Sequence, residues 1–276
     1  MENISKIFPV IVLYKSQLAD AVAYRTLLEK NDFQKIMVYD NSPSDFIQQS
    51  FENPSRIEYV RDVNNGGLSK AYNTAAKFAS QNGFTHLLIL DQDTEFPETA
   101  IDVYKDCSEQ NILCAPILIT KNLSPFSPSQ RNGLRTKALS LSPGVYSLKK
   151  YMPVNSGMMI PIDLFKACGG YDDNVRLDFA DYVFLSRYKL VDSKFRLMNL
   201  IAVQDFSNDE ADIKKLQHRF LLYLQSAQAT RWNSLKEKNL LWLDVIGHTI
   251  ALISRTKKLT FLSLFFKQFF IPKIRF

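Results

Sequence analysis

The first half of the chain alternates short runs of β-branched and other apolar residues with amphipathic stretches. These runs predict strands at 8–14, 36–40, 57–61 and 86–91. Apolar residues near helical spacing predict a helix between the first two strands and an alanine-rich helix from Leu68 to Gln81, and Pro97 suits the first turn of a third helix. Strands that alternate with helices form parallel sheets, so the sequence predicts an α/β fold whose mostly parallel central sheet is flanked by helices.

The second half of the chain follows a different pattern. Residues 120–150 are rich in Ser, Pro and basic residues and have little periodicity, which predicts a long loop. Our hypothesis is that this loop serves as an acceptor-binding or lid element. Short helices are predicted at Ile162–Cys168 and Asp178–Lys189. We therefore expect one domain over residues 1–210, with halves at about 1–95 and 96–210, and a helical extension over 211–276.

Composition and charge exclude several classes of protein. The 46% hydrophobic content excludes a disordered or collagen-like chain. The three cysteines are too few for a disulfide framework, and residues 1–10 do not have the pattern of a secretory leader, so we expect a cytoplasmic protein. No G-x-G, Walker, G-x-S-x-G or H-E-x-x-H motif occurs, and the scattered histidines and cysteines do not predict a zinc site.

The C-terminal extension carries most of the positive charge. Residues 211–276 contain 12 Lys and Arg against 3 Asp and Glu, whereas residues 1–210 contain 22 against 25. Aromatic residues alternate with lysines there, but no uncharged window is long enough to span a bilayer. This pattern favours a helix at the inner membrane surface. Packing on the core or on a second subunit is the alternative, and the absence of a recognisable module makes nucleic acid the least favoured partner.

Two carboxylates follow the strand predicted at 86–91. Asp91 and Asp93 are two positions apart, so in an extended segment their side chains point to the same side. Ligands of open α/β sheets bind at the carboxyl ends of the strands. Carboxylate oxygens there suit Mn²⁺ or Mg²⁺, whose remaining ligands would be water and diphosphate oxygens. The alternative is a polar turn in which an Asp caps the helix near Pro97.

Three further polar segments are candidates for the same site. Asp40 and Asn41 end the second strand, where they suit a nucleoside or simply form an Asx-turn before Pro43. An Asn-Gly-Gly segment precedes the helix at Leu68, where a helix N-terminus favours phosphate. Asp181 lies one turn after Asp178 in a predicted helix, either as a general base or as a carboxylate that stabilises the helix dipole.

Together and in order, these segments resemble the family 2 inverting glycosyltransferases with the GT-A fold. Within that family, they resemble the bacterial rhamnosyltransferase-like branch. The resemblance covers about residues 7–207. VIVLYKSQ, which contains Tyr14, resembles the first strand and the loop that lies against the nucleotide. YDNS resembles the V-D-N-x-S element, which implies that Asp40, with Asn41 beside it, recognises the nucleobase. NNGGLSKAYN resembles the stretch that frames the donor nucleotide, which implies this role for Asn65, Gly66, Gly67 and Asn73.

The later motifs extend this resemblance to the reaction. LDQDT is similar to the D-x-D motif, which implies that Asp91 and Asp93, with Gln92 between them, hold the metal and the diphosphate. VNSGMMIP resembles the segment on the donor-sugar side, with the candidates Asn155, Ser156 and Gly157. LDFADYVFLSR resembles the segment of the catalytic base, which implies that Asp181 is the base and that Asp178 and Arg187 belong to the site.

The sequence departs from the family pattern at three positions. Ala180 and Val183 replace acidic residues beside the base, and Gln204 in VQDFS occupies the place of a metal-binding histidine. Gln204 can offer a carbonyl oxygen to a metal but not an imidazole nitrogen. The departures motivate an alternative function, a non-catalytic subunit that binds nucleotide sugars or glycans in an assembly complex.

The resemblance implies transfer of a sugar with inversion. The donor would be a nucleoside-diphosphate sugar, with rhamnose favoured, and the acceptor a surface-polysaccharide or lipid-linked glycan. We expect a peripheral protein at the inner face of the plasma membrane, which could form a homo-oligomer. A nucleotidyltransferase is a weaker reading, because the Asp181 segment would have no role in it.

Overall fold

A computed structural model describes residues 6–30, 33–132, 135–204, 212–231 and 235–270. The strands of the main sheet are β1 (Ile7–Leu13), β2 (Ile36–Asp40), β3 (Ile57–Arg61), β4 (His86–Asp91), β5 (Thr94–Glu95), β6 (Leu113–Thr120), β7 (Pro125–Ser127), β10 (Gly144–Ser147), β12 (Met159–Pro161) and β13 (Lys194–Gln204). The helices are α1 (Gly67–Gln81), α2 (Ala100–Ser108), α3 (Ile162–Ala167), α4 (Ala180–Val191), α5 (Ile213–Ala229), α6 (Leu235–Thr256) and α7 (Thr260–Phe270).

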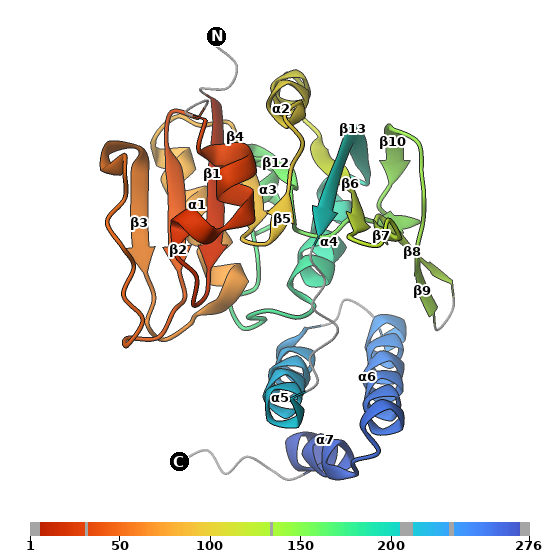
Figure 1. Ribbon diagram of the computed structural model, residues 1–276. Coiled ribbons are helices and arrows are strands. Elements are labelled where there is room, and N and C mark those ends of the chain that lie inside the picture. The colour runs from red at the N-terminus through yellow and green to blue at the C-terminus, as the bar shows by residue number, and fades with distance from the viewer. Residues whose placement is uncertain (1–5, 31–32, 133–134, 205–211, 232–234, 271–276) are drawn as a thin grey trace.

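The central sheet has the predicted α/β character (Figure 1). Its strands follow the order β10-β13-β6-β12-β4-β1-β2-β3, with β5 beside β13 and β7 beside β6. The β1, β2, β3 and β4 strands pair in parallel, whereas β12 runs antiparallel to both β4 and β6. The four N-terminal strands agree with their predicted positions to within one residue. A largely parallel sheet flanked by helices is therefore confirmed.

Alternating side chains of the central strands build the two apolar layers. On β1, Phe8 and Val10 face the layer that contains α1, α3 and α4, whereas Ile7 and Ile11 face the layer that contains α2. The same alternation continues on β2 and β4, as the two-residue period of a strand requires. All these strand residues are buried, and both faces of the sheet are covered, as is usual for parallel strands.

The prediction of a long loop over residues 120–150 is wrong. This segment contains β7 and β10 of the main sheet, and also β8 (Ser129–Asn132) and β9 (Arg135–Ala138), which form a small antiparallel sheet with β11 (Tyr151–Met152). These strands have only two to four residues each, too few to show a period of two. Pairing with other strands stabilises them, and the local sequence does not reveal such pairing.

Three helix predictions need adjustment. The segment after β1 is not one regular helix but a 3₁₀ turn, η2 (Leu18–Asp20), followed by a π-helical turn, η3 (Tyr24–Leu28); a further 3₁₀ turn, η4 (Pro54–Arg56), precedes β3. Helix α2 begins three residues after Pro97. Helix α4 begins at Ala180 rather than Asp178, because Phe179 before it adopts a left-handed backbone with φ +66°. Asp178 therefore does not share a helical turn with Asp181.

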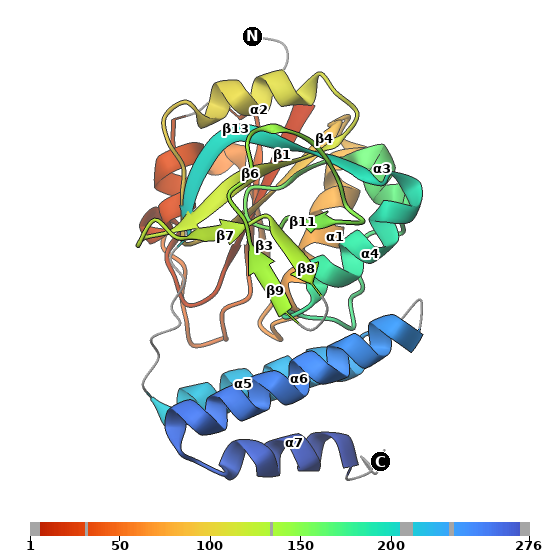
Figure 2. The same cartoon turned by 90° about the vertical axis from the view of Figure 1, so that its right-hand side faces the viewer.

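The three C-terminal helices lie below the sheet layer and pack on one another (Figure 2). Their shared core contains Phe220, Leu224, Ala227, Leu241, Val245, Leu252, Phe261 and Phe265. The helical character predicted for the extension is therefore right, while the expected boundary near residue 210 lies outside the described residues. Among the described helices, none is both long and apolar enough to cross a membrane.

Candidate active site

The register of the central strands brings two of the predicted aspartates to one edge of the sheet. Val12 of β1 pairs with Asp91 of β4, and Leu13 pairs with Asp40 of β2. The two aspartates therefore flank the carboxyl end of β1. The backbone N–H of Asn41 donates to the carbonyl of Leu13 (2.9 Å), which keeps the polar segment after β2 at the same edge.

Asp91 and Asp93 form a pair of like charges in a tight turn. Asp91 ends β4, and residues 92–93 turn the chain into β5, so the two carboxylates meet across a turn rather than along an extended strand. Burial and the charges of Asp93 and Asp181 raise the pKa of Asp91 to about 7, and the Tyr72 hydroxyl donates to Asp91 Oδ1 (3.5 Å). Repulsion between carboxylates falls when a cation lies between them, so the pair fits a hard divalent ion.

Gln204 forms a hydrogen bond to one member of this pair. Its Nε2 donates to Asp93 Oδ1 (2.7 Å), and its carbonyl oxygen accepts from the Thr94 hydroxyl, which also contacts the Ser156 hydroxyl. The carbonyl oxygen of Gln204 thus accepts one hydrogen bond, and its role as a metal ligand stays a prediction. Through its amide nitrogen, Gln204 orients Asp93. Within the described parts of the chain, no three His, Cys, Asp or Glu side chains cluster around one point.

The segment after β2 is buried. Asp40 is fully enclosed, and its two carboxylate oxygens accept from the Tyr59 hydroxyl (2.8 Å) and the Ser42 N–H (2.9 Å). In this structure Asp40 fixes the loop, and its predicted contact with a nucleobase stays a prediction. The side-chain oxygen of Asn41 is buried with no hydrogen-bond partner among the described residues. A buried polar atom of this kind is costly to leave unpaired, which points to a bound group as its partner.

Nearby, the loop after β1 presents Tyr14 at the same edge. The Tyr14 ring is half exposed, and its backbone N–H donates to Gln92 Oε1 (2.9 Å). Gln92 therefore connects the turn of the paired aspartates to the loop beside the predicted nucleotide. The structure brings together Tyr14, Gln92, Asp91 and Asn41 as predicted.

Asp62 organises the Asn-Gly-Gly turn and was not predicted. Its carboxylate accepts from the Tyr39 hydroxyl (2.8 Å), from Lys70 Nζ (2.7 Å) and from the Gly66 N–H (3.3 Å), and its carbonyl accepts from Asn65 N–H (2.9 Å). Asp62 directly follows β3, so the reasoning that selected Asp91 at the end of its strand would have found it. Together these contacts place the turn at the start of α1.

Gly67 lets the backbone of this turn lie close to the backbone of Arg176. Its φ is +88°, and a Cβ there would lie 2.3 Å from the carbonyl oxygen of Arg176. That carbonyl accepts from the Leu68 N–H (2.7 Å). Only glycine fits this position without strain, so the turn after β3 contacts the loop that leads to Asp181.

The segment on the predicted donor-sugar side lies beside the carboxylates. Asn155 is buried and accepts from the Tyr171 hydroxyl (2.7 Å), and Gly157, with φ +75°, contacts Tyr104 through its carbonyl (2.7 Å). The Ser156 hydroxyl reaches the Thr94 and Gln204 network described above. This segment, which directly precedes β12, therefore supports the residues around the paired aspartates.

Two of the predicted residues fasten a loop instead of facing the carboxylates. Asn73 donates to the Tyr171 carbonyl (2.9 Å) and to Asp173 Oδ1 (2.7 Å) and accepts from the Tyr171 N–H (2.9 Å). Arg187 Nη2 donates to the Gly170 carbonyl (2.6 Å). Both side chains are therefore committed to the loop around residues 170–173, and direct contact with the donor stays a prediction for each.

Asp181 is the carboxylate best placed as a base. It lies in the first turn of α4, its charge reaches Asp91, Tyr72 and Tyr171, and burial raises its pKa. The Tyr182 N–H donates to its Oδ1 (2.7 Å). A higher pKa makes a carboxylate a stronger base, which suits proton abstraction from a hydroxyl. Tyr72 and Tyr171, which the sequence did not single out, form its aromatic wall with rings 5.1 Å apart.

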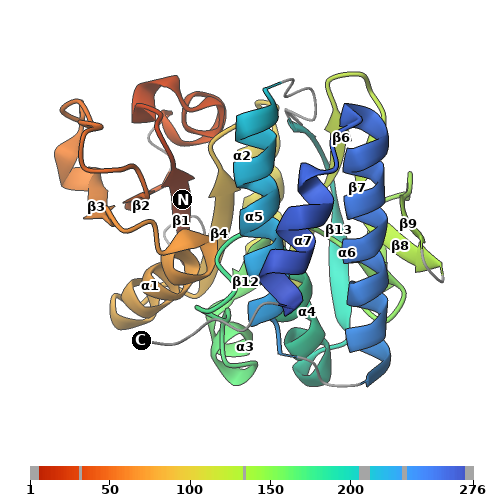
Figure 3. The same cartoon turned by 90° about the horizontal axis from the view of Figure 1, so that it is seen from below.

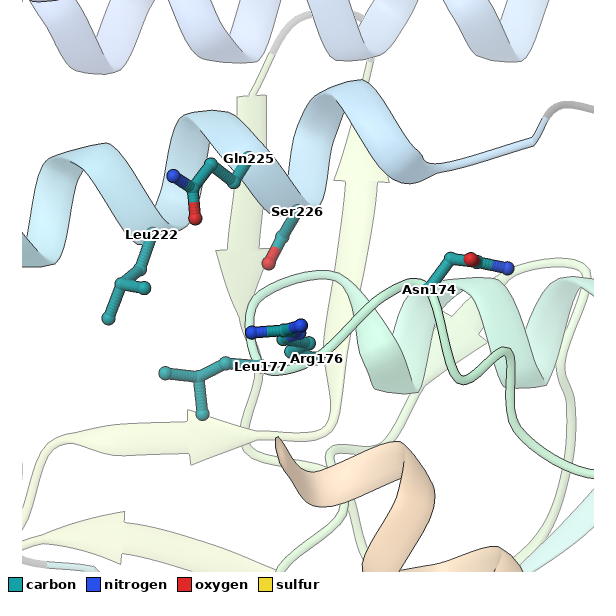
Figure 4. A pocket seen from close by; sticks show the side chains of 6 residues that line it. All are labelled: Asn174, Arg176, Leu177, Leu222, Gln225 and Ser226. Atoms are coloured by element: carbon teal, nitrogen blue, oxygen red, sulfur yellow. The ribbon is translucent and has the colours of Figure 1, made fainter. Parts of the chain in front are cut away.

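Helix α5 contacts the segment that leads into Asp181. Arg219 binds Asp178 through two hydrogen bonds of 2.7 and 2.8 Å, and the Phe179 ring packs on Tyr223 at 4.9 Å. Asp178 is therefore paired with the extension, which no local pattern predicted. Between this segment and α5 lies a cavity of about 290 Å³, shown in Figure 4 and lined by Asn174, Arg176, Leu177, Leu222, Gln225 and Ser226.

Known proteins provide the comparison for this site. Residues 12–118 match the family described as glycosyl transferase family 2. The chain is 25% identical to the dTDP-rhamnosyl transferase RfbF of Shigella flexneri over 183 residues, which cover 64% of this chain and 61% of that relative. The chain therefore spans less than two thirds of the length of this curated relative.

Solved structures of glycosyltransferases share the fold of this chain. A structure of GalNAc-T7 with UDP, GalNAc and Mn²⁺ has a TM-score of 0.55 and 13% identity, covering 87% of this chain and 54% of that one. A structure of S. aureus TarS 1-349 in complex with UDP-GlcNAc has a TM-score of 0.51 and 12% identity, covering 95% and 79%. The fold is the GT-A fold that these glycosyltransferases share. Within this fold, residues 12–118 carry the match to glycosyl transferase family 2.

Proposed function

We propose that this protein transfers a sugar from a nucleoside-diphosphate sugar to a hydroxyl group, with inversion at the anomeric carbon. The observation that carries the proposal is that Asp91, at the end of β4 beside β1, lies near enough to Asp93 and Asp181 for both of their charges to act on it. Two of these carboxylates suit a metal and the third suits a base. Their combination on a family 2 domain supports transfer rather than binding alone.

The nucleotide would lie against the loops after β1 and β2. Tyr14 offers a half-exposed ring there, and the unpaired buried oxygen of Asn41 offers an acceptor for a ligand N–H or O–H group. The turn at Asn65 and Gly66 opens helix α1, whose N-terminus favours the negative charge of a diphosphate. These contacts support a nucleoside diphosphate as the donor's leaving group.

Asp91 and Asp93 would hold Mn²⁺ or Mg²⁺. When bound, such an ion supplies charge stabilisation to the departing diphosphate. Gln204 holds Asp93 through its side-chain N–H and so fixes the direction of one carboxylate. The expected affinity for metal depends on this orientation, because partners of metal-binding groups set their geometry.

In the proposed step, Asp181 takes the proton of the acceptor hydroxyl as its oxygen forms the bond to the anomeric carbon. The bond from that carbon to the diphosphate oxygen breaks on the opposite side, and the electron pair leaves with the nucleoside diphosphate. Tyr72 and Tyr171 are buried and lie near enough to Asp181 for its charge to act on them, so their rings would keep water from that side of the base. Positioning of acceptor and donor then supplies much of the rate enhancement.

The favoured donor is dTDP-rhamnose. The support is the likeness to a dTDP-rhamnosyl transferase, at 25% identity. The proposed acceptor is a surface-polysaccharide or lipid-linked glycan. The cavity beside Arg176 borders the segment that carries Asp181, which makes it the proposed place of approach for the acceptor.

The test measures release of nucleoside diphosphate from a panel of nucleotide sugars, including dTDP-rhamnose, with Mn²⁺, Mg²⁺ or EDTA. We expect release from one donor only with metal, and loss of at least 100-fold in Asp93→Ala and Asp181→Asn. Asp163→Asn, an exposed aspartate of α3, is the matched control and should retain full activity. If no donor is turned over while nucleotide binding persists, the non-catalytic subunit becomes the better description.

A further inference from the structure

The tail helices have an inner apolar face. Phe261 and Phe265 are buried in the core that α7 shares with α5 and α6, and Trp242 packs on Phe269 with their rings 4.5 Å apart. Hydrogen bonds from Gln217 to Thr260 (2.9 Å) and between the Gln228 and Gln268 side chains (2.7 Å) fasten α7 to α5. The sequence pattern favoured a membrane surface for the aromatic residues of the extension, but most of them pack inside the protein.

A second apolar face on α6 points away from that core. Leu243, Ile246 and Ile250 are exposed, Ile250 by 61%, and their spacing of three and four residues places them on one side of the helix. At 100° per residue this row lies about 140° from the buried row that contains Leu241 and Val245. The exposed positions between 243 and 254 are all without formal charge: Leu243, Ile246, Gly247, His248, Ile250, Ala251 and Ser254.

Helix α7 also carries exposed apolar residues. Leu262 and Phe266 are exposed and lie one turn apart, and Leu259 precedes them in the turn after α6. The two helices contact each other and lie side by side on the side of the molecule away from the sheet (Figure 3). We call the exposed residues Leu243, Ile246, Ile250, Leu259, Leu262 and Phe266 the outer face.

From residue 245 onward, the formal charges around the outer face have one sign. Residues 245–276 contain six Lys and Arg and no Asp or Glu. Lys257 and Lys258 are exposed in the turn between the two helices, and Lys267 is exposed on α7. A second copy of this chain would bring the same positive charge against it, which opposes self-association. An apolar surface with a basic border is instead complementary to anionic head groups above a hydrocarbon layer.

We propose that the outer face of α6 and α7 docks on an anionic lipid bilayer. The apolar side chains enter the boundary between head groups and acyl chains, and the lysines contact the phosphates. The inner face meanwhile keeps the helices attached to α5, which itself contacts the segment before Asp181. The reaction would then occur close to the membrane surface, where a lipid-linked acceptor lies.

The experiment is co-sedimentation of the full chain with vesicles of phosphatidylcholine alone or with 30% phosphatidylglycerol, at low and high salt. We expect binding only to the anionic vesicles, with a marked loss at high salt. Lys257→Gln/Lys258→Gln should weaken binding about 25-fold, from about fivefold for each lysine. Ile250→Ser/Phe266→Ser should weaken it at least tenfold.

Matched control variants replace exposed apolar or basic residues outside the C-terminal extension. Ile47→Ser/Leu190→Ser and Lys166→Gln/Lys194→Gln should bind vesicles like the original chain, and circular dichroism checks that every variant is folded. Absence of binding to anionic vesicles, or unchanged binding in both outer-face variants, overturns the proposal. So does a dimer in sedimentation velocity that Ile250→Ser/Phe266→Ser dissociates. None of these readouts requires sugar transfer, so failure of the proposed reaction would leave them interpretable.

Discussion

Replacing Arg219 by Gln should slow sugar transfer without weakening donor binding. Arg219 belongs to α5 and binds Asp178, three residues before Asp181 in the chain. Phe179, between them, has a left-handed backbone that costs a non-glycine residue free energy, and its ring packs on Tyr223 of the same helix. The α5 contacts therefore stabilise the conformation that starts α4 and places Asp181.

The magnitude follows from the geometry of the ion pair. Exposed ion pairs contribute about 0.2–1 kcal/mol, and bidentate pairs between charged groups lie at the strong end. Asp178 is 19% exposed and Arg219 is 53% exposed, so solvent screens the pair partly. We therefore expect a coupling free energy of about 1 kcal/mol. If all of it positions Asp181 in the transition state, kcat falls about fivefold while KM for the donor is unchanged.

The assay is a double-mutant cycle of Asp178→Asn and Arg219→Gln, with kcat and urea unfolding measured for all four proteins. The matched control is the cycle of Asp102→Asn and Lys105→Gln, an exposed pair (3.4 Å) on α2 remote from the site, which should give less than about 0.5 kcal/mol and no change in kcat. A coupling below about 0.3 kcal/mol in both readouts, or a change confined to donor KM, would refute the reasoning.

Three other perturbations test the site. Asp62→Asn should lower the free energy of unfolding by about 2 kcal/mol at pH 7, because it weakens hydrogen bonds to a charged group. Burial alone would raise the pKa of Asp62, but hydrogen bonds from Lys70 and Tyr39 lower it overall, so this stability is present above the unfolded value of 3.8 and is lost as pH falls through the lower folded value. Urea unfolding at several pH values should show the two proteins converging in acid; a constant difference contradicts this account. Gln204→Leu should weaken Mn²⁺ binding 10–100-fold in calorimetry, whereas Gln225→Leu on α5 should not; equal affinities would show that Asp93 needs no partner. Gly67→Ala should destabilise the protein by at least about 2 kcal/mol in thermal or urea unfolding, because its φ is positive and the Arg176 carbonyl occupies the place of the Cβ, while Gly247→Ala, at an open helical position, should be neutral or slightly stabilising.

The sequence predicted those parts of the site that depend on local pattern. The end of a parallel strand is visible as an apolar run followed by a polar residue, which located Asp40 and Asp91 at one edge. The same rule applies to Asp62 after β3. The short strands of residues 125–147 could not be found in this way, because pairing with β6, β13 and β11 creates them.

The sequence could not predict which groups the polar side chains of the site bind. Asn73 and Arg187 lie in segments that resemble donor-binding motifs, yet their polar groups bind the loop at 170–173. Gln204 ends β13, but the choice between its amide nitrogen and oxygen depends on Thr94, which is 110 positions away. Such choices are made by neighbours that are distant in the chain, and periodicity carries no information about them.

The extension shows why composition alone could not choose between packing and a membrane. Its helices have both kinds of surface, with Phe261 and Phe265 on the inner face and Leu262 and Phe266 on the outer one. Deleting the extension would remove the membrane contact and also the Arg219 partner of Asp178, so a loss of activity in a truncated chain would not say which mattered. Point substitutions separate the two. Variants at Ile250 and Phe266 alter the outer face and leave the pair of Arg219 and Asp178 in place, whereas Arg219→Gln removes that pair and leaves the outer face intact. Independent effects on vesicle binding and kcat are therefore what this arrangement requires.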